Sequence, residues 1–153
     1  MSGLLAGKTA IIYGGGGALG GAAARVFARE GARVFLAGRT RSKLEAVAGD
    51  IDSAGGTAEI ATLDLFDEAQ VRNHADAVAA KTGGIDVMFN AIGIKHVQGK
   101  AFAETSLEEF EQPIARTVRA EFIAAQAVAR HMVTRQRGVI LTLTTPGGRI
   151  AGA

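Results

Sequence analysis

Five short apolar runs alternate with longer segments of helical periodicity, and this alternation restricts the fold more than any other feature of the chain. Strand-length runs separated by helices are typical of βαβ units, in which crossover helices join parallel strands. The expected strands are 9–13, 33–37, 58–63, a run that begins at 86, and 138–143. The expected helices are 19–30, 41–54, 67–82 and 106–135. The pattern predicts a single α/β domain over residues 1–153, a doubly wound parallel sheet with helices on both faces.

A glycine-rich segment, YGGGGALGG at residues 13–21, lies between the first expected strand and the first expected helix. Glycines let a ligand approach the backbone, and the free amides and dipole of a helix N-terminus attract phosphate. The alternative is a tight turn that binds nothing. Within a βαβ unit we favour the ligand and predict a dinucleotide-binding loop of the Rossmann type, with strand order 3-2-1-4-5. The residues expected to contact the cofactor here are Gly14, Gly16, Gly17, Ala18, Leu19 and Gly20.

The end of the second expected strand indicates which dinucleotide is bound. NAD-binding folds usually place a carboxylate there for the ribose hydroxyls, whereas this chain has Gly38 and Arg39. A guanidinium pairs with a 2′-phosphate that a carboxylate would repel, and Arg41 and Lys43 add positive charge nearby. NADP(H) is therefore preferred over NAD(H). The alternative is that Arg39 is an ordinary solvated loop residue.

Composition excludes several other classes of function. The chain has no cysteine, so disulfides, thiolate metal sites and cysteine nucleophiles are ruled out, and a cytoplasmic location is expected. Its three histidines lie far apart in sequence without matching carboxylates, so no metal site is predicted. With 17 Lys and Arg against 15 Asp and Glu, and no basic run, nucleic-acid binding is not expected. No apolar run approaches the roughly 18 residues of a membrane helix, so no membrane partner is expected.

Taken together, these motifs resemble the short-chain dehydrogenase/reductase family, and most closely its 3-oxoacyl-(acyl carrier protein) reductases. The segment GKTAIIYGGGGALGGAAA resembles the opening of that family, a Thr-Gly pair followed by a Gly-x-x-x-Gly-x-Gly loop. In this register Tyr13 stands at the threonine position, and Gly14, Ala18 and Gly20 stand at the three glycine positions. Ala18 adds a methyl group where the family has none.

Two further motifs carry the resemblance along the chain. The segment LDL at 63–65 is similar to the Asp-hydrophobic pair of the family, which implies that Asp64 bonds the adenine amino group and that Leu65 lies beside it. The segment FNAIG is similar to the Asn-Asn-Ala-Gly motif after the fourth strand. It implies cofactor contacts from Asn90, Ala91, Ile92 and Gly93.

The departures from the family pattern concern catalysis. The resemblance places Thr117 where the family has an active-site asparagine, and Thr145 where it has a serine. The family's Tyr-x-x-x-Lys pair is absent, because the only tyrosine is Tyr13 in the glycine loop. Hydride transfer to a carbonyl needs a positioned acid, which this tyrosine supplies in the family. We therefore expect these 153 residues to be truncated before that segment.

The resulting prediction is an NADP(H)-dependent oxidoreductase of the short-chain type. It would transfer hydride to or from a ketone, an alcohol or a 3-oxoacyl thioester as its small-molecule substrate. Two alternatives remain open: a non-catalytic nucleotide-binding or scaffold protein of the same fold, and an enoyl-type reductase. The helix expected at 106–135 corresponds to one that pairs subunits in the family, which implies a homo-oligomer, either a tetramer or a dimer. Pro113 is expected to kink or break that helix.

Overall fold

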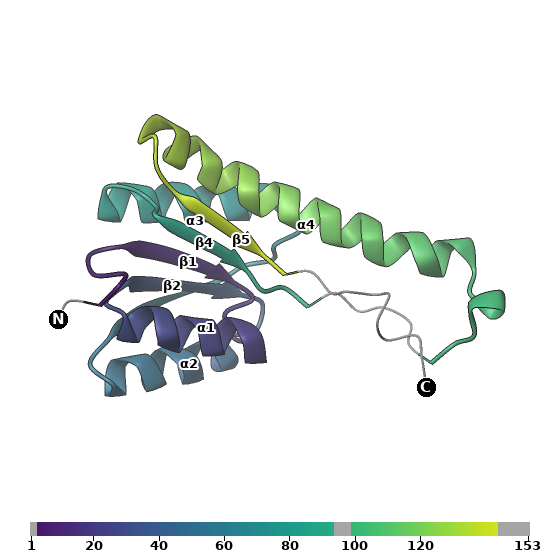
Figure 1. The fold of residues 1–153 in the computed structure, drawn as a ribbon, viewed down its shortest axis with the longest axis horizontal. Helices are drawn as coiled ribbons and strands as arrows, with labels where there is room; N and C mark the ends of the chain where they lie inside the picture. The colour runs from purple at the N-terminus through teal and green to yellow at the C-terminus, as the bar shows by residue number, and fades with distance from the viewer. Residues whose placement is uncertain (1–2, 94–98, 144–153) are drawn as a thin grey trace.

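The computed structural model describes residues 3–93 and 99–143, which form a three-layer α/β fold around a parallel sheet (Figure 1). Within these residues the sheet has five strands in the order β3-β2-β1-β4-β5, which confirms the predicted topology. The strands are β1 (Thr9–Tyr13), β2 (Arg33–Gly38), β3 (Thr57–Thr62), β4 (Val87–Asn90) and β5 (Val139–Thr142). The helices are α1 (Ala18–Arg29), α2 (Arg41–Ser53), α3 (Glu68–Thr82), the 3-10 turn η1 (Phe102–Glu104) and α4 (Leu107–Thr134).

Two apolar cores lie on opposite faces of the sheet, because successive residues of a strand point to opposite sides. On one face Ile11 and Tyr13 of β1 pack under α3 and α4, and on the other Ala10 and Ile12 pack against α1 and α2. Figure 1 shows these two helix pairs as separate layers above and below the strands. All five residues of β1 are buried, as expected for the central strand of a doubly wound sheet.

Helix α4 begins with a capping box, in which the Ser106 side chain accepts a bond from the Glu109 amide and the Glu109 carboxylate accepts one from the Ser106 amide. The helix runs as a single element through Pro113, so the break predicted there does not occur. Proline removes only one helical hydrogen bond, to the carbonyl four residues earlier, and most residues in this part of α4 are exposed, where water can accept that role.

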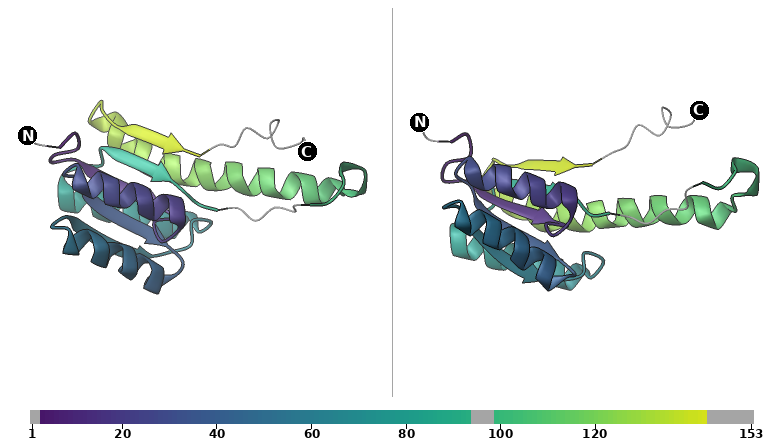
Figure 2. Two further views of the ribbon diagram at one scale, coloured as in Figure 1. Left: turned by 60° about the horizontal axis from the view of Figure 1, so that its bottom comes forward. Right: turned by 90° about the horizontal axis from the view of Figure 1, so that it is seen from below.

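The N-terminal half of α4 projects beyond the sheet, which two further views show from other sides (Figure 2). Large apolar side chains recur along this half at helical spacing and are exposed: Leu107, Phe110, Ile114, Val118 and Phe122. The four residues of β5 are also exposed. Residues 144–153, which include Thr145, and residues 94–98 lie outside the described part of the structure.

Candidate functional site

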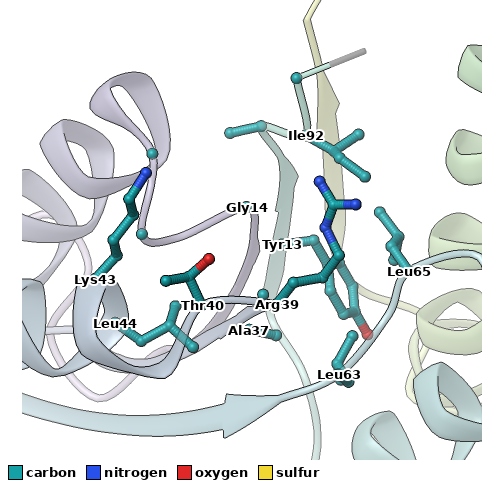
Figure 3. Close-up of a pocket in the computed structure, with 15 residues that line it drawn as sticks. Tyr13, Gly14, Ala37, Arg39, Thr40, Lys43, Leu44, Leu63, Leu65 and Ile92 are labelled. Atoms are coloured by element: carbon teal, nitrogen blue, oxygen red, sulfur yellow. The ribbon is translucent and has the colours of Figure 1, made fainter. Parts of the chain in front are cut away.

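A cleft of about 300 Å³ opens at the carboxyl ends of β1, β2 and β4 (Figure 3). This is the edge at which doubly wound folds bind ligands. Nine predicted cofactor residues line it: Gly14, Gly16, Gly17, Gly38, Arg39, Leu65, Ala91, Ile92 and Gly93. Six further lining residues were not on the list of predicted contacts: Tyr13, Ala37, Thr40, Lys43, Leu44 and Leu63. The structure therefore brings motifs from four separate segments of the chain to one cleft.

The glycine loop is packed so tightly that side chains are excluded from it. Gly14 has φ of +75°, and a Cβ on this residue would lie 2.6 Å from the carbonyl oxygen of Ala91. The Gly14 and Gly15 amides both donate to the Ala37 carbonyl, at 2.8 and 3.2 Å, which ties the loop to the end of β2. A Cβ on Gly20 would collide with the Gly14 carbonyl, so this glycine serves helix–loop packing.

The N-terminus of α1 opens beside the loop without a side-chain cap. Its N-cap is Gly17, which supplies no side-chain acceptor, and the first turn continues with Ala18 and Leu19. Both of these residues are exposed and neither lines the cleft, whereas Gly17 does. A helix N-terminus of this kind presents unpaired amides and a partial positive charge, which suits a phosphate group.

Basic side chains from the end of β2 and the start of α2 line the cleft. Arg39 follows β2, Lys43 lies in the first turn of α2, and Thr40 lies between them. Figure 3 shows the two basic side chains on different sides of the cleft, with the Arg39 guanidinium beside Ile92 and Leu65 and Lys43 on the other side. Neither forms an ion pair with another residue in the described ranges, whereas Arg41 is paired with Glu45 at 2.7 Å. The local excess of positive charge therefore comes from Arg39 and Lys43 rather than from Arg41.

The segment after β3 contributes apolar surface. Leu63 and Leu65 are buried and line the cleft, while Asp64 between them does not. One Asp64 carboxylate oxygen accepts a bond from the Phe66 amide at 3.1 Å, so this side chain is turned into its own loop. The expected contact between Asp64 and adenine stays a prediction.

The segment after β4 closes the opposite wall. Asn90 is only 1% exposed, and its Oδ1 accepts a bond from the Ile92 amide at 3.2 Å. The Ala91 amide donates to the Tyr13 carbonyl at 2.9 Å, so the wall is attached to the end of β1. Asn90 thus lies behind the cleft and holds Ala91 and Ile92, which line it.

Tyr13 is part of the floor of the cleft, a placement that the sequence did not indicate. Its side chain is fully buried, and its hydroxyl has no hydrogen-bond partner among the described residues. The ring meets that of His74 edge-on, with centroids 5.9 Å apart. Burial raises the pKa of the Tyr13 phenol far above its usual value and lowers the pKa of His74 to about 4. Both groups are therefore neutral at physiological pH, and the phenol is a poor proton donor.

Of the two predicted catalytic threonines, the structure describes only Thr117. Thr117 is half-buried on α4, outside the cleft, and its hydroxyl donates to the Pro113 carbonyl at 2.7 Å. Thr145 falls outside the described residues. Another side chain on α4, Glu121, was missed by sequence reasoning, because the burial of its neighbours Ala120 and Ala124 is visible only in the structure.

Comparison with known proteins gives the family. A family model described as short chain dehydrogenase matches residues 8–153. A 2,5-dichloro-2,5-cyclohexadiene-1,4-diol dehydrogenase of Sphingobium indicum is 34% identical over 95% of this chain and 57% of its own length. The gluconate 5-dehydrogenase of Gluconobacter oxydans is 31% identical over 96% of this chain and 57% of its own length. The chain belongs to the short-chain dehydrogenase/reductase family of oxidoreductases.

Solved structures agree with this assignment. A short-chain type dehydrogenase/reductase from Mycobacterium marinum superposes with a TM-score of 0.83 at 34% identity, over 97% of this chain and 60% of the other. A metagenomic short-chain oxidoreductase in complex with NADP superposes with a TM-score of 0.81 at 30% identity, over 94% of this chain and 65% of the other. The chain thus spans less than two thirds of these relatives. Within its described residues no helix combines the length and apolarity needed to cross a membrane.

Proposed function

We propose that this chain binds NADP(H) and forms the cofactor-binding part of a reductase or dehydrogenase. The observation that carries the proposal is that Arg39 and Lys43, which form no ion pair with any residue the structure describes, both line a cleft that begins at an uncapped helix N-terminus. Among the described residues that line this cleft, none is a carboxylate. A 2′-phosphate beside the two cations and a pyrophosphate at Gly17 would both find complementary charge.

Different residues around the cleft would bind different parts of NADP(H). Gly14, Gly16 and Gly17 admit the pyrophosphate to the backbone, and the Leu65 and Ile92 side chains offer apolar surface to the adenine. Bound NADP(H) would supply or accept the hydride for a carbonyl or alcohol substrate. The similar dehydrogenases and the NADP complex of a structural relative support this proposal.

A non-catalytic nucleotide-binding protein is the second candidate, and one observation favours it. The hydroxyl of Thr117 is committed to a carbonyl of its own helix, and a threonine replaces the family's asparagine at this position. Turnover of a ketone in the presence of NADPH, measured at 340 nm on this chain joined to a Tyr-x-x-x-Lys segment from one of its relatives, decides between the two. Binding without turnover over a panel of ketones and 3-oxoacyl thioesters would support the non-catalytic role.

We also propose that the chain forms a homo-oligomer, a dimer or a tetramer, through α4. The exposed apolar stripe defined by Leu107, Phe110, Ile114, Val118 and Phe122 supports this, because monomers rarely leave such a row open to water. Sedimentation of the wild type against Phe110→Glu tests it. A mass that is the same in both, and equal to that of one chain, would refute it.

The cofactor preference is tested by isothermal titration with NADPH and NADH. Replacing Arg39 by alanine removes one charge-assisted contact and should weaken NADPH binding by about 2 kcal/mol, roughly thirtyfold, with little effect on NADH. Arg41→Ala is the matched control, because that guanidinium is paired with Glu45. Equal losses for both nucleotides in Arg39→Ala would rule out the 2′-phosphate role.

A further inference from the structure

A carboxylate lies on the face of α4 that packs against the sheet. Glu121 neighbours Ala120 and Ala124, which are fully buried, and its Oε2 is buried without a hydrogen-bond partner among the described residues. Burial raises the pKa of Glu121, and the amide of Asn90 partly offsets this effect. A carboxylate in such a place is unfavourable unless a donor reaches it.

The side-chain amide of Asn90, at the end of β4, is a donor in the same α4–β4 interface. Its Nδ2 is also buried and has no partner within the described ranges that meets ordinary hydrogen-bond geometry. A buried donor and a buried acceptor, each without a partner among the described residues, therefore belong to the same α4–β4 interface. A small movement of the Glu121 side chain towards the Asn90 amide would complete a hydrogen bond and satisfy both groups.

The opposite end of the Asn90 side chain is connected to the cleft. Its Oδ1 accepts from the Ile92 amide, and Ala91 and Ile92 form the wall that lies against Gly14. The contact there is close, since a Cβ on Gly14 would approach the Ile92 nitrogen to 2.9 Å. Rotation of the Asn90 amide would therefore shift the wall relative to the glycine loop.

We propose that Glu121 is a positioning residue of the nucleotide cleft: it accepts a hydrogen bond from the Asn90 amide and so fixes the wall formed by Ala91 and Ile92. The expected effect of Glu121 on NADPH affinity rests on the proposed function. Its effect on the position of Ala91 and Ile92 does not. Glu121 does not line the cleft, so its influence passes through Asn90.

The test compares Glu121→Gln, which keeps an acceptor, with Glu121→Leu, which fills similar space without one. Glu111→Ala is the control, an exposed glutamate on the same helix. The first readout is hydrogen exchange at the Ile92 amide, and the second is the dissociation constant for NADPH. Glu121→Leu should lower the protection of Ile92 and weaken NADPH binding by about tenfold each. In Glu121→Gln both the Ile92 protection and the dissociation constant for NADPH should stay within about threefold of the wild-type values. Glu111→Ala should give the wild-type values.

A double-mutant cycle with Asn90→Ala separates positioning from a general loss of stability. If Glu121 acts through Asn90, Glu121→Leu adds no further loss in the Asn90→Ala background. Wild-type protection and affinity in Glu121→Leu, or equal losses in the Leu and Gln variants, would overturn the proposal. If wild-type protein binds no NADPH, the proposed function fails, while exchange at Ile92 still decides the role of Glu121.

Discussion

Replacing Gly14 by alanine is expected to damage the fold and the cleft together. Its φ of +75° costs an L residue about 1–2 kcal/mol. The new Cβ would also lie 2.6 Å from the Ala91 carbonyl oxygen, so packed backbone must move, at about 1–3 kcal/mol. The reduced entropy of the unfolded chain offsets about 0.4–1 kcal/mol of this. The free energy of unfolding should therefore fall by about 3 kcal/mol.

Gly49→Ala is the matched control for this substitution. Gly49 lies in the interior of α2, and a Cβ there would meet no other atom within 4 Å. Alanine should stabilise the helix at this position by up to about 1 kcal/mol. Urea unfolding followed by far-UV circular dichroism measures both variants, and NADPH titration measures the cleft. A Gly14→Ala variant within about 1 kcal/mol of wild type, with unchanged affinity, would show that the wall and the loop are not in tight contact.

Three smaller perturbations test the interior of the site and its supports. Tyr13→Phe removes a buried hydroxyl without a partner in the described structure and should raise the free energy of unfolding by about 1 kcal/mol in urea; a loss would reveal a partner for that hydroxyl. Burial lowers the pKa of His74 from 6.5 to about 4, so the unfolded chain binds the proton more readily and stability should fall as pH falls from 6.5 towards 4. Stability measured against pH should be flatter there in His74→Gln, and an unchanged slope would contradict this. Asp67→Ala removes the N-cap acceptor for the Gln70 amide and should lower the free energy of unfolding by about 1 kcal/mol, seen as a lower thermal midpoint. An unchanged midpoint would show that this cap does not stabilise α3.

The fold was predictable because its determinants are local in sequence. Runs of period two and segments of period 3.6 set each element, and the observed strands and helices begin and end within one residue of the expected positions where these were stated. Pro113 was the exception, because its effect depends on whether water or protein surrounds the lost hydrogen bond. That information lies in the tertiary arrangement of α4 rather than in the neighbouring residues.

The site was predictable where backbone geometry determines the residue. Glycines before a helix indicated a phosphate-binding loop. An arginine after β2, in place of the usual carboxylate, indicated a site for a 2′-phosphate. The positions of Thr40 and Lys43 in the same cleft depend on how the first turn of α2 faces the glycine loop, which no local pattern encodes. The ring contact of Tyr13 with His74 joins residues 61 positions apart, so only the packed structure brings them together.

The central claim is that Arg39 and Lys43, which have no ion-pair partner in the described part of the chain, select the 2′-phosphate. The ratio of two dissociation constants tests this claim most directly. Isothermal titration of the wild-type chain with NADPH and with NADH, at one salt concentration, measures that ratio. The arrangement of Arg39 and Lys43 predicts that NADPH binds at least about tenfold more tightly, and that Arg39→Asp abolishes or reverses the preference. Equal affinities in the wild type, or a preference for NADH, would contradict it.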